Sequence, residues 1–245
     1  MGKLCLIKET TVNNFLNAIL ASGLLLFGSN HNTLKGNEQI LKKSLVNDQT
    51  SITNIIDTLT NTEAKYTRKR YISFQKNFPN SKWSISNKKQ INDFDFLIDI
   101  KVEGENNKFE IESIQTIRLN KINNGKFTKK ILKEETLLKS KGSSLIVNAK
   151  IPDRALSGTK YDLDIVIDNP LDNSILAGGI ALISEEEFRN NTPPKIKLIP
   201  IGSGGLFKVA KAPLKPTIQY WGIILAHKEG IIALTKMVRI VNKLE

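Results

Sequence analysis

The chain has 245 residues, with 36 Lys and Arg against 24 Asp and Glu, two His and one Cys, and a formal net charge of +12. This length accommodates two domains, and a composition of 40% hydrophobic and 24% charged residues excludes wholesale disorder. The single cysteine excludes an intramolecular disulfide and a Cys-rich zinc module.

The positive charge is concentrated in the middle of the chain. Residues 61–150 carry 19 basic and 10 acidic side chains, whereas residues 151–245 carry 12 and 10. Of those 19 bases 16 are lysine, and base reading relies on the fork of arginine, so the excess favours a solvated surface over nucleic-acid recognition. A surface for an anionic partner remains an alternative, and its residues would be Lys129, Lys130 and Lys133.

Residues 1–31 form a candidate targeting segment. Within it, residues 15–28 (FLNAILASGLLLFG) have only Asn17 and Ser22 as polar interruptions. A bilayer-spanning helix needs about 20 apolar residues, so this run is short for one and matches the apolar region of a signal peptide. We expect export or membrane anchoring through residues 15–28, and the alternative is a buried first helix of a cytoplasmic protein.

Helical periodicity dominates the following segment. One apolar stripe at helical spacing is formed by Ile52, Ile55, Ile56 and Leu59. Further helices are expected over residues 37–46 and 65–77, and Pro79 ends the second of these. These helices begin a domain that we expect to cover residues 32–141.

From Trp83 the apolar period changes to two, which is typical of half-buried strands. Residues 96–102 and 109–119 alternate in this way, and residues 127–138 follow as a third long strand. Asn123-Asn124-Gly125 favours a tight hairpin between the last two strands. The pattern predicts an antiparallel meander with the preceding helices covering one face. The predicted fold of this domain is therefore α+β.

Residues 141–144 (KGSS) mark a boundary, beyond which short strands alternate with turn clusters. Seven strands without a helix predict an all-β sandwich over residues 144–245. The expected strands are residues 145–149, 160–168, 176–183, 195–201, 206–210, 219–227 and 231–241. We expect Tyr220, Trp221 and Phe207 to lie in the sandwich core, with a partner-binding patch as the alternative.

The middle segment resembles the nuclear transport factor 2-like (cystatin-like, SnoaL-type) cone. The resemblance covers residues 37–140 and is carried by Tyr71, Phe74, Phe78-Pro79, Trp83 and the segments 93–105, 109–121 and 123–138. It implies helices packed into the concave face of a long curved sheet. No Asp-His or Tyr-Asp pair of the enzyme members is matched, so the resemblance implies no catalytic residues.

The C-terminal segment resembles an immunoglobulin or fibronectin type III-like sandwich. Residues 158–179 and 219–241 carry this resemblance. The paired cysteines of immunoglobulin domains are absent, so only the architecture is implied. The combination is similar to envelope proteins in which such a cone precedes a β-sandwich, an uncharacterised group for which we know no established activity.

Ser113 and Gln115 are polar residues on the otherwise apolar face of their predicted strand. If the cone holds a pocket, we expect its lining to include Tyr71, Trp83, Ser113, Gln115 and Glu134. The alternative is a hydrogen-bonded polar pair in a closed core. Paired carboxylates on the same sheet, Glu110 and Glu112 with Glu134 and Glu135, are explained more simply by cross-strand ion pairs.

No other pattern predicts chemistry. Gly202-Ser203-Gly204-Gly205 lacks the following helix of a phosphate loop, and Asp162, Asp164, Asp168 and Asp172 lack the calcium-loop spacing. His31 and His227 have no ligand partners at metal-site spacing. We predict no catalytic residues, no metal and no cofactor.

The sequence favours a non-enzymatic, envelope-associated binding or scaffolding protein with a protein partner. The first alternative is a small-ligand-binding or hydrolase- or isomerase-like cone enzyme. The second is a basic binder of nucleic acid or another anionic surface. The oligomeric state is not predicted.

Overall fold

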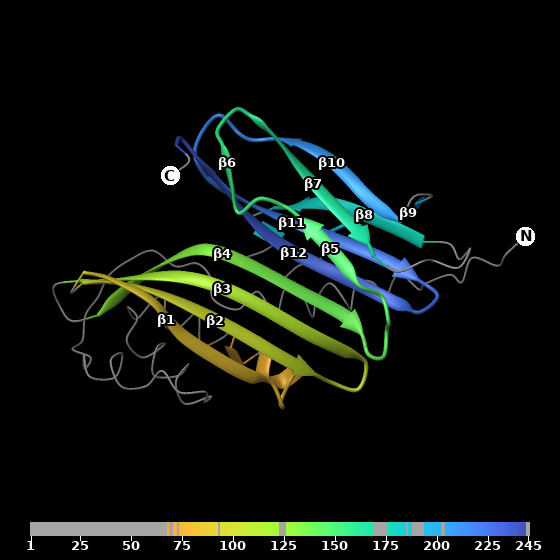
Figure 1. Cartoon of the computed structure of the whole chain (residues 1–245), viewed down its shortest axis with the longest axis horizontal. Coiled ribbons are helices and arrows are strands. Elements are labelled where there is room, and N and C mark those ends of the chain that lie inside the picture. Colours follow the sequence, from red (N-terminus) through yellow and green to blue (C-terminus); the bar gives the residue numbers. More distant parts are fainter. Residues whose placement is uncertain are drawn as a thin grey trace, which may run out of the picture. The chain divides into compact units, whose positions relative to one another are not determined.

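The computed structural model describes residues 68, 71–72, 74–92, 94–122, 126–168, 176–184, 186–187, 194–201 and 204–243. They divide into two units at Thr136 and Leu137, within strand β4. We call the described residues up to Thr136 the meander unit and those from Leu137 the sandwich unit. Figure 1 labels the strands of both, and each unit is described by itself.

The meander unit is a sheet of four neighbouring strands in the order β1-β2-β3-β4. Their bounds are β1 (Lys82–Asn92), β2 (Asp95–Glu105), β3 (Phe109–Lys121) and β4 (Phe127–Ser140). The pairing of β1 with β2 and of β2 with β3 is antiparallel, and it sets Trp83, Val102 and Ser113 in one row across the sheet.

The sequence of β2 and β3 explains their pairing. Alternate residues of β2, from Phe96 through Val102, are buried, because period-two apolar residues share one face. The turn to β3 is formed by Asn106, whose side-chain oxygen accepts hydrogen bonds from the main-chain N–H groups of Lys108 and Phe109, each at 2.9 Å. Such an Asx turn fixes the register of the hairpin.

The sandwich unit contains two sheets that face each other. One has the order β12-β11-β8-β9, with β6 parallel to β12, and the other has the order β10-β7-β5. The bounds are β5 (Val147–Lys150), β6 (Arg154–Leu156), β7 (Lys160–Ile167), β8 (Leu176–Ile183), β9 (Ile199–Ile201), β10 (Gly205–Lys211), β11 (Thr217–His227) and β12 (Gly230–Val241). A β-sandwich therefore forms this part of the protein.

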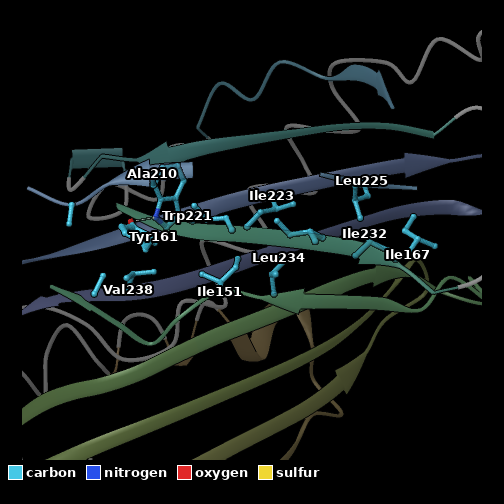
Figure 2. Packing of buried hydrophobic residues seen from close by; sticks show 14 of the residues in the cluster. Ile151, Tyr161, Ile167, Ala210, Trp221, Ile223, Leu225, Ile232, Leu234 and Val238 are labelled. Atoms are coloured by element: carbon cyan, nitrogen blue, oxygen red, sulfur yellow. Dashed lines mark hydrogen bonds between the residues drawn. The ribbon is translucent and has the colours of Figure 1, made fainter. Parts of the chain in front are cut away.

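The core of the sandwich is built by side chains from both sheets. Figure 2 shows Tyr161 and Ile167 from β7 lying against Trp221, Ile223 and Leu225 from β11. On β7 the buried residues alternate with Asp162, Asp164 and Val166, as the sequence predicted. On β11 and β12 both faces are buried, so these two strands are almost continuously apolar.

The predicted α+β class is wrong, and the fold is all-β. Every described residue of the helix predicted over residues 65–77, namely 68, 71–72 and 74–77, is helical, and from Lys82 onward strands predominate among the described residues. Within the described part of the chain, paired strands and no layer of helices form the fold. The helices predicted over residues 37–46 and 52–59 lie outside the described residues.

Both family resemblances are also wrong. The described residues are mostly in strands, with helix limited to residues 68, 71–72, 74–77 and 186–187, which is neither a helix-covered nuclear transport factor 2-like cone nor that cone followed by an immunoglobulin-like domain. The error came from reading an antiparallel meander and a run of short strands, which many folds share, as marks of particular families.

The strands themselves were predicted better than the fold. The seven expected strands of the sandwich all coincide with observed ones, although β9 is limited to residues 199–201 and the short β6 was missed. The sequence analysis also missed β1 as a complete strand. Only Trp83 and Ile85 continue its apolar alternation before the polar run from Asn87, so the pattern is too short to identify it.

The predicted targeting segment, residues 1–31, lies outside the described residues. Among the described residues, no helix is long and apolar enough to cross a membrane.

Candidate functional site

Four polar side chains lie buried on one face of the meander unit. Ser113 and Gln115 come from β3 and Glu134 and Thr136 from β4, and each is at most 3% exposed. The Gln115 amide donates to Glu134 Oε1 at 2.7 Å, and the Ser113 and Thr136 hydroxyls lie 2.8 Å apart. Of the predicted pocket residues, the structure thus brings Ser113, Gln115 and Glu134 into one cluster, to which the sequence analysis did not assign Thr136.

This polar cluster is hydrogen-bonded but not fully satisfied. Gln115 Oε1 is buried and accepts no hydrogen bond within the described part of the chain. A buried carbonyl oxygen without a donor costs about 1–3 kcal/mol, so the surrounding apolar packing must offset it. All four side chains of the cluster are buried.

The other two predicted pocket residues form an aromatic contact. Tyr71 lies edge-on to Trp83, with ring centroids 5.4 Å apart, and Phe74 contacts the same indole at 5.5 Å. The indole N–H donates to Ser81 Oγ at 3.1 Å. Burial raises the pKa of Tyr71 above its ordinary value. The pocket that was predicted from these five residues stays a prediction.

The residues of the predicted anionic-partner surface lie on β4. Lys130 is exposed, whereas Lys129 and Lys133 are half-buried. Among the predicted acidic residues, Glu112 forms a cross-strand ion pair with Lys101 at 3.0 Å. Lys101 also lies 2.7 Å from Glu103, and hydrogen bonds to both carboxylates raise its pKa.

No group of His, Cys, Asp and Glu side chains within the described ranges could hold a metal ion. His227 is buried at the end of β11, where its Nδ1 accepts the main-chain N–H of Glu229 at 3.4 Å. This contact caps the turn to β12.

A second buried polar network connects the two sheets of the sandwich. The Tyr161 hydroxyl donates to Gln219 Oε1 at 2.6 Å and accepts the Trp221 indole N–H at 2.9 Å. Burial raises the pKa of Tyr161, with the Trp221 hydrogen bond opposing the shift. Trp221 lies in the sandwich core, as predicted. Tyr220 is buried as well, but it points to the opposite face of β11, outside that core cluster.

Phe207, by contrast, was predicted in the core and is 64% exposed. It lies on β10, where the preceding Leu206 packs against the core. Lys208 is on the same side of the strand as Leu206, and although this lysine is exposed, its ammonium lies 5.8 Å from the centre of the Trp221 ring. Val209 is 63% exposed on the outward side. Residues 207 and 209 therefore form an apolar pair on the outer face, which we call the β10 pair.

Strand β10 is also the edge of its sheet. It pairs with β7 on one side, and the described residues place no strand on its other side. The ladder to β7 is continued by Ile167 N–H to Gly204 O at one end and by Ala212 N–H to Thr159 O at the other. On the β10 side, both bonds use even-numbered residues, Gly204 and Ala212, so the odd-numbered residues of β10 direct their N–H and C=O groups away from β7. We call this second side of β10 the open edge, because no described strand pairs with it.

The outer face beside this edge is charged. In the register of β10 and β7, Phe207 lies opposite Asp164, Val209 opposite Asp162, and Lys211 opposite Lys160. The candidate site is therefore an edge strand, β10, with two exposed apolar side chains. Two aspartates lie opposite them on β7, and a pair of lysines lies at one end of the two strands. The sequence analysis had considered a partner-binding patch at Phe207 and had not identified the edge.

Comparison with known proteins identifies one region of similarity. Residues 142–241 match the family described as a domain of unknown function (DUF8623). This match lies within the sandwich unit and includes β10. No curated protein matches the chain.

The buried hydroxyl pair gives a stability prediction. Ser113→Ala or Thr136→Val alone is expected to cost about 1–3 kcal/mol of unfolding free energy, because each leaves the other hydroxyl buried without this partner. The double variant should cost less than the sum, which a double-mutant cycle from urea unfolding measures. The exposed Ser84→Ala is the control, and strictly additive costs would contradict the coupling.

The Tyr161 network gives a pH prediction. Its raised pKa means that the folded state holds the phenol proton more tightly than the unfolded state, so this stabilisation is present below pH 10.0 and is lost as pH rises through the raised value. Tyr161→Phe should lower the free energy of unfolding near neutral pH. The difference in this free energy between the variant and the unmodified protein should become smaller in alkaline solution. Urea unfolding across that pH range measures both curves, and curves that stay parallel would contradict the prediction.

Proposed function

We propose that this protein is a non-enzymatic binding or scaffolding protein that contacts a protein partner through β10 and the outer face of the sheet β10-β7-β5. The observation that carries this proposal is the exposure of the β10 pair, Phe207 and Val209, at 64% and 63%. The two side chains stand next to each other on one face of one strand.

Single exposed apolar residues are common on protein surfaces and need no partner. Phe207 and Val209 are different because they are neighbours on one face of a strand whose second edge pairs with no described strand. A single partner could cover these two side chains and also bond to the main-chain groups of that edge. Aromatic side chains are enriched at the centre of protein interfaces, and polar residues form the rim around them. Asp162 and Asp164 provide such polar residues here.

The non-enzymatic part of the proposal is supported by the environment of the acidic and amide side chains. Glu134 and Gln115, two of the residues predicted to line a pocket, contact each other in the interior of the meander unit. A general acid or base has to reach a proton on its substrate.

Envelope association is proposed from the sequence alone, since residues 15–28 have the length and composition of a signal peptide's apolar region. The natural protein should therefore be found in the envelope fraction, either shortened at its N-terminus or anchored there. Intact-mass and N-terminal peptide analysis of each fraction measures this. A full-length protein in the cytoplasmic fraction would contradict envelope association and leave the binding proposal standing.

The binding proposal is tested by replacing Phe207 with a photo-cross-linking amino acid in the natural host. Irradiation should give a covalent adduct with one protein, identified by mass spectrometry. The same replacement at Lys228, exposed in the turn from β11 to β12, should give none. Adding Val209→Lys should greatly reduce the adduct. Equal adducts at both positions, or none at position 207, would contradict the proposed surface.

A further inference from the structure

We infer that β10 binds its partner by strand addition: an extended segment of the partner pairs antiparallel with the open edge of β10 and becomes a fourth strand of the sheet β10-β7-β5. This inference rests on the proposed function and specifies how the partner is recognised. Its support comes from the main chain of β10, from the rows of side chains across the sheet and from the charges at the end of the strand.

The main chain of β10 is prepared for pairing. Gly205, Phe207, Val209 and Lys211 direct their N–H and C=O groups away from β7, and none of these four is proline. An incoming strand would therefore complete up to four donor and acceptor pairs at once. Strand addition draws its affinity from such main-chain hydrogen bonds.

Edge strands in monomeric proteins are usually protected from this pairing by being short, bulged, or lined with charges or proline. β10 extends over seven residues, and its register with β7 runs without a break from Gly205 to Lys211. Its outward side chains at the centre are Phe207 and Val209. A continuous strand with apolar outward residues is suited to accept a partner.

The rows across the sheet predict the sequence of the added strand. Directly opposite residues on one face contact each other, and pairs of aromatic with β-branched residues are favourable. The partner residues opposite Phe207 and Val209 should therefore be apolar. The residue opposite Gly205 should also be apolar, because the Phe207 ring extends over this glycine and leaves an apolar surface there.

The charge at the end of the strand predicts an acidic residue. Lys211 and Lys160 are direct cross-strand neighbours on the outer face, and like charges in this position repel each other. Neither lysine has an ion pair in the part of the chain that the structure describes. A carboxylate opposite Lys211 would neutralise this repulsion. Read in its own direction, the partner segment is therefore acidic–x–apolar–x–apolar–x–apolar.

A second copy of the chain fits this edge less well. Two β10 strands related by a twofold axis and paired along their whole length would place the two Lys208 side chains directly opposite each other. This central position belongs to a pair without hydrogen bonds, where facing side chains are closest. Each copy also carries a net charge of +12. The observations favour a separate acidic and apolar segment.

The test uses the full chain and a blocked heptapeptide as the probe. The peptide has aspartate at its first position, valine at the third and fifth, leucine at the seventh and threonine elsewhere. Fluorescence anisotropy should show saturable binding. In amide-exchange measurements the peptide should slow the N–H groups of Phe207 and Val209 at least tenfold, whereas those of Leu206 and Lys208, already bonded to β7, should change little.

Matched controls separate strand pairing from apolar adsorption. N-methylation of the two valines removes N–H groups that face β10 and should weaken binding at least tenfold, while N-methylation of the second and fourth residues, which face away, should have little effect. Lys211→Glu should weaken binding of the acidic peptide, and a peptide with lysine in place of aspartate should restore it. Val209→Pro removes an N–H that β7 does not use, so the fold should remain and binding should fall.

Absence of saturable binding, or binding that is equally sensitive to both N-methylated peptides, would overturn the inference. Self-association of the chain through β10 in sedimentation measurements would overturn it as well, in favour of a second copy. These outcomes are distinguishable from failure of the proposed function. An adduct at position 207 without strand pairing would support the proposed binding surface and contradict strand addition. Strand pairing with the peptide but no adduct in cells would support strand addition and contradict the proposed function.

Discussion

Main-chain hydrogen bonding in strands that are buried on both faces is the constraint on which the sandwich unit depends. β11 has no solvent-facing side from Gln219 to His227, so each of its peptide groups needs a partner inside the sheet. β12 supplies one along eleven register pairs and β8 along seven on the other side. Tyr161 completes the interior by satisfying the polar groups of Gln219 and Trp221.

The hairpin between these two strands requires glycine at one position. Gly230 has φ 140°, and a Cβ there would lie 2.6 Å from the Cβ of Ser140. This close approach allows Ser140 Oγ to accept a hydrogen bond from the main-chain N–H of Ile231 at 2.9 Å. The main-chain N–H of Ile231, at the start of β12, thus has a hydrogen-bond acceptor. In the same unit, one edge of β10 pairs with no described strand.

The sequence predicted the elements of the sandwich because its strands have one clear apolar parity or are apolar throughout, and Pro and Gly separate them. It did not predict which face of β10 is inside. Apolar residues occur at both parities of β10, namely Leu206, Phe207, Val209 and Ala210. The structure places the exposed Lys208 on the same side as Leu206, with its ammonium 5.8 Å from the centre of the Trp221 ring. An alternation rule takes such a lysine as a mark of the outer face.

In the meander unit the sequence identified Ser113 and Gln115 as polar exceptions, and Glu134 as a neighbour, but it could not reveal Thr136. The buried residues of β4 change parity between Ile131 and Glu134, so an alternation counted from Phe127 places Thr136 on the wrong face. The fold class failed for a different reason. Helical periodicity in the first part of the chain was extended into a helical layer, and a local pattern does not establish how layers are stacked.

The open edge of β10 also connects the proposed partner to the solubility of the protein. A strand that offers unpaired peptide groups beside Phe207 and Val209 is a template for any extended chain, including misfolded ones. If the proposed partner supplies the added strand, protein made in excess of that partner would be exposed to aggregation. The proposal therefore implies that the cell produces both chains together and in matched amounts.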